Sequence, residues 1–522
     1  MSSKGINVRS YDNKEQLLFP PSIGDFLKGD DVVHVIDEAV ESINLQPYYD
    51  KVSVVGNPAY HPEMMIKIWF YGYATRVTTS RKIEDRLYRD VGFIYLAGMQ
   101  KPDFKAISEF RRRYLKELKE SFVEILRLCG RLGLTKLGEI ALDSKVMKAN
   151  ASAEKSYSEK GLKEEQEFLE EAIEEYLKEV TVRDAQDDER YGSDKRGDEL
   201  PEEIQVKQKR VKKMKEVLKR LKEAEEELKK SKKEKINLTD TDARFQKEKT
   251  GFIPGYRGEI AVDSQNQIIV ACDVTNEVTD EPSLVMMADK IVENVQELKR
   301  ENQEGLQEPL TEPIKLLADS GYSSGANLAQ LSEREEMDPY IPDKAYTAKE
   351  RGHTTQEDSD FHNSRFLFDE EQKTLLCPSG QKVPLIKERL YKGKSYYYFK
   401  FHGCKNCSYF GRCSVDQSGR GVKILKDLCH IKAMRKKLST QLGKKIYALR
   451  QITAEPAIGN LSYNLGFREF HLRRLTKVKG EFALMCMAHN LLKIAKFLKQ
   501  ISKTLKQALS TKAIPLPVPN TS

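Results

Sequence analysis

The sequence predicts a mixed α/β protein that begins with an all-α domain and carries two insertions within its sheet. Three observations predict this fold. Residues 22–120 show helical periodicity, short apolar runs typical of strands begin at Gly138, and a Glu- and Lys-rich segment separates the first run from the next. A chain of 522 residues suggests about three or four domains, so it is long enough to bury several cores.

Composition excludes several classes of protein. The charged fraction of 32% and the apolar fraction of 39% are more polar than an average soluble domain, which predicts a solvated extension. No run of about 18 apolar residues is present and the N-terminus lacks an apolar signal segment, so neither a membrane span nor secretion is expected. Eight Cys are too few for a disulfide framework, which favours a reducing, cytoplasmic location. The net charge of +8 is modest, so any nucleic-acid signal must come from basic clusters.

Residues 1–133 are predicted to form a compact helical domain. Residues 30–43 are amphipathic, and Asp30 or Asp31 can cap the start of that helix. Residues 61–77 are apolar over most of the helix surface, which predicts burial. Two further helices are expected at 79–93 and 104–133.

From Gly138 the pattern changes to that of strands in one mixed sheet. The expected strands are 138–146, 258–266, 267–275, 314–322 and 337–343. The second and third are adjacent and predict a hairpin, while helices are expected at 282–300 and 324–335. A hairpin followed by alternating strands and helices is typical of a mixed α/β sheet.

Residues 154–236 interrupt the sheet with a charged segment dominated by Glu and Lys. Its apolar residues recur at coiled-coil spacing: Leu169, Ile173, Tyr176, Val180, Ile204, Val211, Met214, Leu218, Leu221 and Leu228. The polar stretch 183–201 is interpreted as the turn of an antiparallel helical hairpin. Two roles stay open: a solvated spacer, or an arm for interaction or dimerisation.

Two of the predicted strands end alike, in LDS at 142–144 and ADS at 318–320. Asp143 and Asp319 at strand ends can share one rim of the sheet and hold Mg²⁺ through carboxylate oxygens. An Asp at such a position is also a common turn residue or helix cap. Asp263, Asp273 and Asp280 are interpreted as structural or supporting groups.

Several segments resemble those of bacterial insertion-sequence transposases of the DDE class. IALDSKVMKANAS (140–152) resembles the first catalytic strand, LLADSGYSSGANL (316–328) the second, and RQITAEPAIGNLSYNLGFREFHLRRL (450–475) the segment that bears the last acid. Residues 57–87 and 101–113 resemble the N-terminal helical domain, and 239–284 resembles the central strands. The resemblance covers most of the chain outside 154–236 and the C-terminal tail.

The resemblance implies an RNase H-like mixed sheet with Asp143, Asp319 and Glu455 as its acids, binding Mg²⁺ or Mn²⁺. It implies metal-dependent cleavage and strand transfer at the inverted-repeat ends of an insertion sequence, with element-end and target DNA as partners. A homodimer in the complex and a cytoplasmic, nucleoid-associated protein are expected. Two alternatives stay open: a catalytically lapsed DNA-binding protein (repressor or remnant), and a nuclease without strand transfer.

Glu455 has competitors in the same segment, namely Glu469 and Glu481. Tyr447 and Arg450 match residues that precede the last acid in related transposases, but Ser462 stands where a DNA-contacting Lys is expected. Pro456 predicts that Glu455 lies at or near a helix start. The basic segments 111–119, 432–450, 471–480 and 493–507 suggest phosphate contacts, and the DNA-binding candidates are Tyr447, Arg450, Arg473, Arg474 and Lys477.

Four of the eight cysteines lie close together in the sequence: Cys377, Cys404, Cys407 and Cys413. C-x-x-C is a common half-site for tetrahedral zinc, so one structural Zn²⁺ is expected, with plain reduced thiols as the alternative. Residues 383–403 alternate like a hairpin. The remaining cysteines, Cys129, Cys272, Cys429 and Cys486, lie in apolar contexts and are expected in the core.

These predictions give a domain plan. A helical, DNA-binding domain occupies 1–133, and a disordered tail occupies 508–522. The catalytic domain is built from 134–153, 237–345 and 431–507, with the charged coiled-coil insertion at 154–236 and the cysteine-containing insertion at 346–430.

Overall fold

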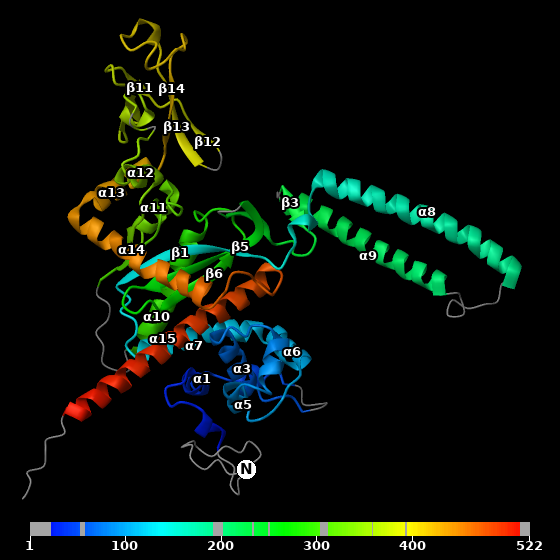
Figure 1. Cartoon of the computed structure of the whole chain (residues 1–522). Helices are drawn as coiled ribbons and strands as arrows, with labels where there is room; N and C mark the ends of the chain where they lie inside the picture. The colour runs from blue at the N-terminus through cyan, green and yellow to red at the C-terminus, as the bar shows by residue number, and fades with distance from the viewer. Residues whose placement is uncertain are drawn as a thin grey trace, which may run out of the picture. The chain divides into compact units, whose positions relative to one another are not determined.

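The computed structural model describes residues 22–52, 58–191, 202–231, 234–248, 251–302, 312–355, 357, 359–391 and 394–511. The chain divides into two compact units (Figure 1). One consists of residues up to Arg113 together with those from Ala495 onward, and the other is Tyr114–Ile494.

The first unit is helical, as predicted. Its elements are η1 (Ile23–Phe26), α1 (Val32–Glu41), α2 (Gln46–Tyr49), α3 (Pro62–Ala74), α4 (Ser80–Arg86), α5 (Val91–Leu96) and α6 (Phe104–Arg113). Asp31 caps α1 by accepting from the Val33 N–H at 3.1 Å. Trp69, at the centre of α3, is fully buried and donates to the Ile107 carbonyl at 3.2 Å, which ties α3 to α6.

Two helices that the sequence predicted as continuous are broken. The helix expected at 79–93 divides because Asp90 caps a new helix, accepting from the Gly92 and Phe93 N–H groups. The helix expected at 104–133 divides at Tyr114 into α6 and α7 (Leu115–Arg131). α7 belongs to the second unit, where Arg127 pairs with Glu297 of α10 (Ser283–Asn302) at 2.9 Å.

The second unit is built on a mixed sheet, which confirms the predicted fold class at that level. Its strands are β1 (Glu139–Lys148), β4 (Arg244–Glu248), β5 (Gly251–Asp263), β6 (Ile269–Thr275), β7 (Ile314–Leu317) and β8 (Met337–Tyr340). The order is β4-β5-β1-β7-β8, and β6 also pairs with β5. β5 runs antiparallel to β1 and β6, whereas β1, β7 and β8 are parallel.

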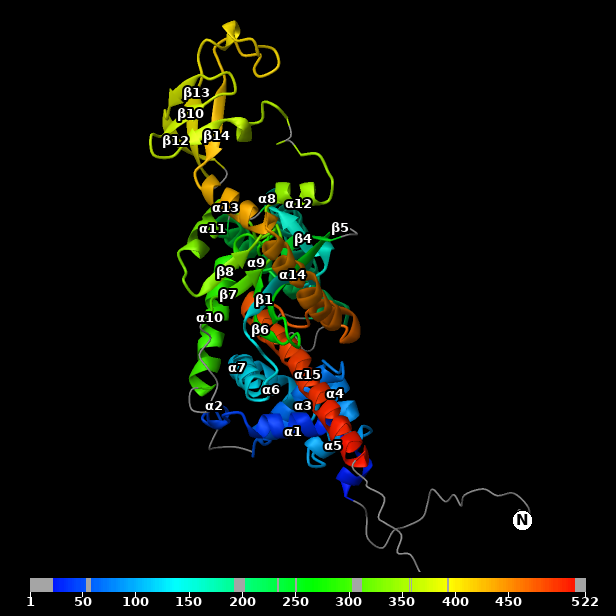
Figure 2. The same cartoon turned by 90° about the vertical axis from the view of Figure 1, so that its left-hand side faces the viewer.

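Helices cover this sheet. α14 (Gln441–Gly459) packs across β1, β5, β7 and β8, while α10 packs against β5 and β6 (Figure 2). The remaining helices are α11 (Gly325–Ser332), α12 (Lys344–Glu350), α13 (Leu428–Ser439) and α15 (Leu475–Thr511). On α15, the Asn490 amide accepts from the Ile269 N–H and donates to the Ile269 carbonyl, each at 2.9 Å, so it fixes the start of β6.

The prediction that Glu455 lies near a helix start is wrong. α14 begins at Gln441 and continues through Pro456 to Gly459, where a π-helical turn (Asn460–Asn464) follows. Pro456 has no N–H, so the Ile452 carbonyl one turn earlier loses its helical partner. The Gln267 side chain replaces that partner by donating to the Ile452 carbonyl at 3.1 Å, and the helix therefore continues.

Two long helices, α8 (Glu159–Tyr191) and α9 (Glu202–Ser231), lie between β1 and β4 in sequence and pack antiparallel (Figure 1). Gln166 bonds to Glu225 at 3.1 Å, and Lys222 pairs with Glu170 at 2.7 Å. The expected seam residues Ile173, Val211, Leu221 and Leu228 are buried. The side chains of Val180 and Ile204 lie outside the described residues. The prediction of a turn at 183–201 is wrong for residues 183–191, which belong to α8. Residues 192–201 are not among the described residues.

The cysteine-containing segment forms two small sheets. One has the order β11-β10-β9 (Lys382–Pro384, Thr374–Leu376 and Leu367–Asp369), and the other β12-β13-β14 (Lys387–Tyr391, Lys394–Lys400 and Gly421–Leu425). The β12–β13 pair corresponds to the predicted hairpin. The segment has its own core of buried residues: Phe366, Leu375, Val383, Tyr397, Phe399, Phe401, Val422 and Ile424.

The ends of the chain bear on two further predictions. Among the described helices, none is long and apolar enough to cross a membrane. α15 extends to Thr511, into the tail that was predicted to be disordered from 508, and residues 512–522 lie outside the described part of the chain.

The Gln267 bond leads to a testable prediction. Gln267→Ala should destabilise the second unit by about 0.5 kcal/mol, because the carbonyl of exposed Ile452 exchanges this hydrogen bond for one to water. In a Pro456→Ala background the new N–H restores the helical bond, so the same substitution should cost less. Urea unfolding of the four proteins gives this double-mutant cycle. Gln265→Ala, at an exposed neighbouring position, is the control, and equal costs in both backgrounds would contradict the assignment.

Candidate active site

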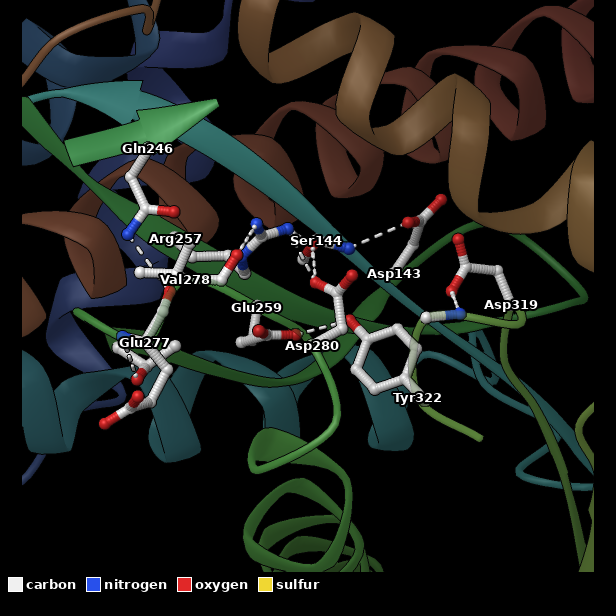
Figure 3. Close-up of polar contacts among 12 residues, drawn as sticks. Asp143, Ser144, Gln246, Arg257, Glu259, Glu277, Val278, Asp280, Asp319 and Tyr322 are labelled. Carbon is white, nitrogen blue, oxygen red and sulfur yellow. Dashed lines mark hydrogen bonds and ion pairs between the residues drawn. The ribbon is translucent and has the colours of Figure 1, made fainter. Parts of the chain in front are cut away.

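Asp143 and Asp319 lie at the same level of the sheet. β1 and β7 are parallel neighbours with Ala141 opposite Leu317, and each Asp follows two residues later. The Asp319 carboxylate accepts from the Gly321 N–H at 2.7 Å, which shapes the turn after β7. Figure 3 shows the two carboxylates on these neighbouring segments. The parallel pairing therefore brings together two acids that lie far apart in the sequence.

Asp143 is largely enclosed, with 18% of its side chain exposed. Its Oδ1 accepts from the Ser144 N–H at 2.8 Å and its Oδ2 from Arg450 Nη1 at 3.2 Å. Burial raises the pKa of Asp143 to about 6, the charges of Asp319 and Asp280 act in the same direction, and Arg450 opposes them. A carboxylate held with a raised pKa beside other acids is typical of a functional site.

Glu455 is the acid of its segment that approaches this pair. Arg450 Nη2 lies 3.8 Å from Glu455, so one guanidinium group contacts both Glu455 and Asp143. Glu481 is fully buried and accepts from the His471 and Leu472 N–H groups, which is a structural role. The backbone of exposed Glu469 forms a β-bridge to Lys148. The structure therefore distinguishes Glu455 from both competitors, although half of its side chain is exposed.

Two acids on the β5–β6 hairpin, Asp263 and Asp273, and Asp280 in the loop after it differ in role. Asp263 accepts from the Lys136 and Leu137 N–H groups. Asp273 pairs with Lys290 and Lys479, and both of these arrangements are structural. Asp280, by contrast, lies against the site. Its Oδ1 accepts from the Ser144 hydroxyl at 2.5 Å and from Arg257 Nη1 at 2.7 Å.

Sequence reasoning missed Arg257, Glu259 and Tyr322. Glu259, on β5, is fully buried and accepts from the Tyr322 hydroxyl at 2.5 Å (Figure 3). Burial raises the pKa of Glu259 to about 8, the charge of Asp280 raises it further, and the hydrogen bond from Tyr322 opposes the shift. Because Tyr322 follows Asp319 by three residues, this bond anchors the turn that carries Asp319. The pattern GEIAVD around Glu259 was visible as a strand, but nothing in it indicated a partner in a distant turn.

The donor set fits a divalent cation of the Mg²⁺ type. Asp143, Asp319 and Glu455 supply three carboxylates as possible ligands, and Asp280 pairs with Arg257, so negative charge is in excess over the guanidinium groups of Arg257 and Arg450. Hard oxygen ligands of this kind suit Mg²⁺ or Mn²⁺. In the described part of the chain, no three His, Cys, Asp or Glu side chains already form a metal-binding group.

The five residues that were expected to contact DNA fall into two groups, one beside the carboxylates and one on exposed positions after α14. Arg450 faces the carboxylates, and half-buried Tyr447 lies beside it, with its pKa raised by burial. Arg473 is exposed and donates to the Asn150 carbonyl at 3.0 Å. Arg474 lies 3.9 Å from Asp242, and Lys477 is exposed.

Two further features belong to the segment that carries Glu455. A cleft of ≈ 390 Å³ opens beside Glu455 between α12 and α14, lined by Tyr346, Arg351, Lys444, Tyr447, Arg450 and Glu455. Ser462, at the position where a Lys was expected, is only 3% exposed. It lies beside Met147 and Phe482. This position therefore does not face solvent in this chain.

The four clustered cysteines line one small pocket of ≈ 50 Å³. Cys377 accepts from the Gln381 N–H at 3.3 Å, and Arg420 Nη1 lies 2.9 Å from the Cys413 sulfur. Hydrogen bonds from the Tyr409 N–H and from Ser379 lower the pKa of Cys407. Such donors favour thiolate, the form that binds metal. Elsewhere, Cys129 and Cys486 are buried as expected and Cys272 is half-buried, but Cys429 is exposed, so its predicted core position is wrong.

Two family models match the chain. Residues 376–495 match the family described as "Transposase DDE domain", and residues 21–113 match "Transposase domain (DUF772)". No curated protein and no solved structure matches significantly. The first match includes Glu455 and the four cysteines, while Asp143 and Asp319 lie outside both.

The two family matches indicate an insertion-sequence DDE transposase, a class of protein that acts on DNA. DNA transposase function follows from these matches, and enzymes of this family typically use a divalent metal ion. The helical first unit contains the second match, and the first match runs through the cysteine-containing segment into α15.

The raised pKa of Glu259 predicts a pH dependence of stability. The unfolded carboxyl titrates near 4.5 and the folded one near 8, so the folded state keeps a proton that the unfolded state has lost. Stability should therefore fall as pH rises from about 4.5 to 8, by an amount on the order of a few kcal/mol. Glu259→Gln should make this fall smaller, measured as the unfolding midpoint across pH 4.5–9 without divalent ions, and the raised pKa of Asp143 contributes to the fall that remains. Glu139→Gln, on neighbouring β1, is the control and should keep the slope of the parent.

Proposed function

We propose that this transposase cuts DNA at the ends of its insertion sequence and joins the freed ends to target DNA, with Asp143, Asp319 and Glu455 as its three catalytic acids. The observation that carries the proposal is the parallel β1–β7 register, which brings Asp143 and Asp319 to one level. Arg450 extends the cluster to Glu455 on α14.

We also propose that the sheet is RNase H-like. The order β6-β5-β1-β7-β8, with an antiparallel half followed by a parallel half, supports this assignment. The long helix α14 across β1 then carries the last acid, as the sequence resemblance implied.

Each group has a role in this proposal. Mg²⁺ or Mn²⁺ held by Asp143, Asp319 and Glu455 would activate water for hydrolysis and the freed 3′-hydroxyl for joining. The Ser144 N–H orients the Asp143 carboxylate, and the Gly321 N–H orients that of Asp319. Arg450 neutralises Asp143 and reaches Glu455, so it limits the repulsion between acids on different elements.

The charge distribution of the first unit supports DNA as the partner. Residues 22–63 contain eight Asp or Glu and two Lys, whereas 76–113 contain ten Lys or Arg and five Asp or Glu. Exposed Arg81 lies over the Phe104 ring and exposed Lys101 over that of Tyr88, so cations and aromatic rings occur together on this half. Clustered cations are what phosphate binding requires.

A cleavage assay tests the function. The full-length protein and DNA containing an end of the element are incubated with Mg²⁺, beside Asp143→Asn, Asp319→Asn and Glu455→Gln. Each variant should cut at least about a thousandfold more slowly, since a metal supplies several kcal/mol of transition-state stabilisation. Glu469→Gln, from the same segment as Glu455, should cut like the parent.

The outcomes separate the alternatives. A parent that binds the end DNA without cutting it would be a lapsed DNA-binding protein, and one that cuts without joining would be a nuclease. Light scattering of the complex with end DNA should give the mass of two chains, because two ends must meet in one complex. Variants of Asp143 and Asp319 that cut as well as the parent would reject the proposed site.

We further propose that Cys377, Cys404, Cys407 and Cys413 hold one structural Zn²⁺. All four line the same pocket, hydrogen-bond donors lie beside the sulfurs of Cys377 and Cys413, and the pKa of Cys407 is lowered, which favours its thiolate. Four thiolates leave no open position for water, so the ion would stabilise the small sheets without taking part in chemistry.

Metal analysis tests this assignment. Protein purified without chelator should contain about one zinc per chain. Cys404→Ser combined with Cys407→Ser should release it and make residues 377–413 sensitive to protease. Cys429→Ser, an exposed cysteine outside the pocket, should change neither property. Metal-free parent protein that resists protease in this segment would favour plain reduced thiols.

A further inference from the structure

Asp280 is an acid beside the site to which neither family match nor the three-acid assignment gives a role. It lies in the loop between β6 and α10, outside both matched ranges. Its side chain is only 17% exposed. A buried carboxylate in a loop must be held by specific partners, because burial of an unpaired charge is costly.

One oxygen of Asp280 belongs to a closed triangle of hydrogen bonds. Oδ1 accepts from Ser144 Oγ at 2.5 Å and from Arg257 Nη1 at 2.7 Å, and the same Nη1 donates to Ser144 Oγ at 3.1 Å (Figure 3). Arg257 Nη2 also donates to the Val278 carbonyl at 2.8 Å. The triangle therefore joins the residue after Asp143 on β1, a residue on β5, and the loop that carries Asp280.

The other oxygen of Asp280 lies against the turn that carries Asp319. A Cβ atom added to Gly321 would meet Asp280 Oδ2 at 2.6 Å and Asp319 Oδ1 at 2.9 Å. Both oxygens thus approach one point beside Gly321, where any side chain would collide with them. The loop and the turn are in direct contact only because residue 321 is glycine.

We propose that Asp280 is a positioning residue, which holds the strand that carries Asp143 at a set distance from the turn that carries Asp319. This inference rests on the proposed function, since it takes those two acids as the pair that binds the ion. Carboxylates on separate segments repel one another, and an ion requires its ligands within a few tenths of an ångström. Asp280 helps to keep these ligands at a fixed separation. Ser144 and Arg257 hold its Oδ1 by hydrogen bonds, and its Oδ2 contacts Gly321. It acts through these neighbours and does not touch the reacting atoms.

The loop provides a matched control. Glu277, three residues earlier, pairs with Arg244 at 3.0 Å, just as Asp280 pairs with Arg257. No contact of the Glu277 side chain reaches Ser144, Asp143 or the Asp319 turn among those of the described residues. Glu277→Ala and Asp280→Ala therefore each remove one Arg–carboxylate pair from the same loop, and only the second disturbs the triangle.

Calorimetric titration with Mn²⁺ tests the inference on the full-length protein, with the Mn²⁺ concentration for half-maximal cleavage as a second measurement. Asp280→Ala should weaken Mn²⁺ binding about tenfold or more, the usual effect of losing a group that orients a metal ligand. Asp280→Asn keeps an oxygen acceptor for Ser144 and Arg257, so it should remain within about threefold of the parent. Glu277→Ala should match the parent in both measurements.

Further variants keep the test decisive if Asp280→Ala does not fold. Ser144→Ala removes one side of the triangle and should weaken Mn²⁺ binding severalfold, and Ser144→Thr should restore it. Equal behaviour of the Asp280→Ala and Glu277→Ala proteins would overturn the inference. Loss in Asp280→Asn as deep as in Asp280→Ala would also overturn it, because charge rather than hydrogen-bond geometry would then matter. A parent that neither binds Mn²⁺ nor cuts DNA would instead reject the proposed function itself.

Discussion

The structure around the site depends on one constraint: several carboxylates lie close together where water is scarce. Such groups raise each other's pKa and repel, and they stay together only if the surrounding chain supplies positive charge or N–H donors. Asp143 has both, from Arg450 and the Ser144 N–H. Asp280 has Arg257 and the Ser144 hydroxyl. Glu259 accepts from the Tyr322 hydroxyl, and burial raises its pKa to about 8 although the charge of Arg257 acts against the shift.

The same constraint explains why α14 must be held firmly. Arg450 and Glu455 lie on either side of Ile452, whose carbonyl is left open by Pro456. Gln267 closes that gap from the β5–β6 turn, and its own side-chain oxygen accepts from Lys493 of α15 at 2.8 Å. The Gln267 side chain thus joins the helix that carries Glu455 to the β5–β6 turn and to α15, in addition to the packing of α14 against the sheet. A mid-helix proline is tolerated here because its lost hydrogen bond is replaced.

Much of the architecture was predictable from local patterns. The β5–β6 hairpin, the parallel strands after it and the antiparallel helices α8 and α9 all follow from apolar periodicity that the sequence shows directly. The predicted helix boundaries were wrong at positions where one residue started, interrupted or failed to end a helix. Asp90 started a new helix, and Tyr114 interrupted another. Pro456 did not end α14, because the Gln267 side chain donates to the Ile452 carbonyl that the proline leaves without its helical partner. Gln267 lies 185 residues before Ile452, so no local pattern indicated this bond.

The sequence by itself determined which segments become strands or helices, since hydrophobic periodicity is a local property. It also indicated Asp143 and Asp319 through their similar strand ends, and Glu455 through its resemblance to transposases. Only the tertiary structure decided that Arg450 faces these acids, that Glu469 and Glu481 do not, and that Asp280, Arg257, Glu259 and Tyr322 surround them. The physical reason is that burial and charge pairing depend on which distant segments meet. Strand pairing and helix packing determine which distant segments meet, and a local sequence pattern does not predict either of them.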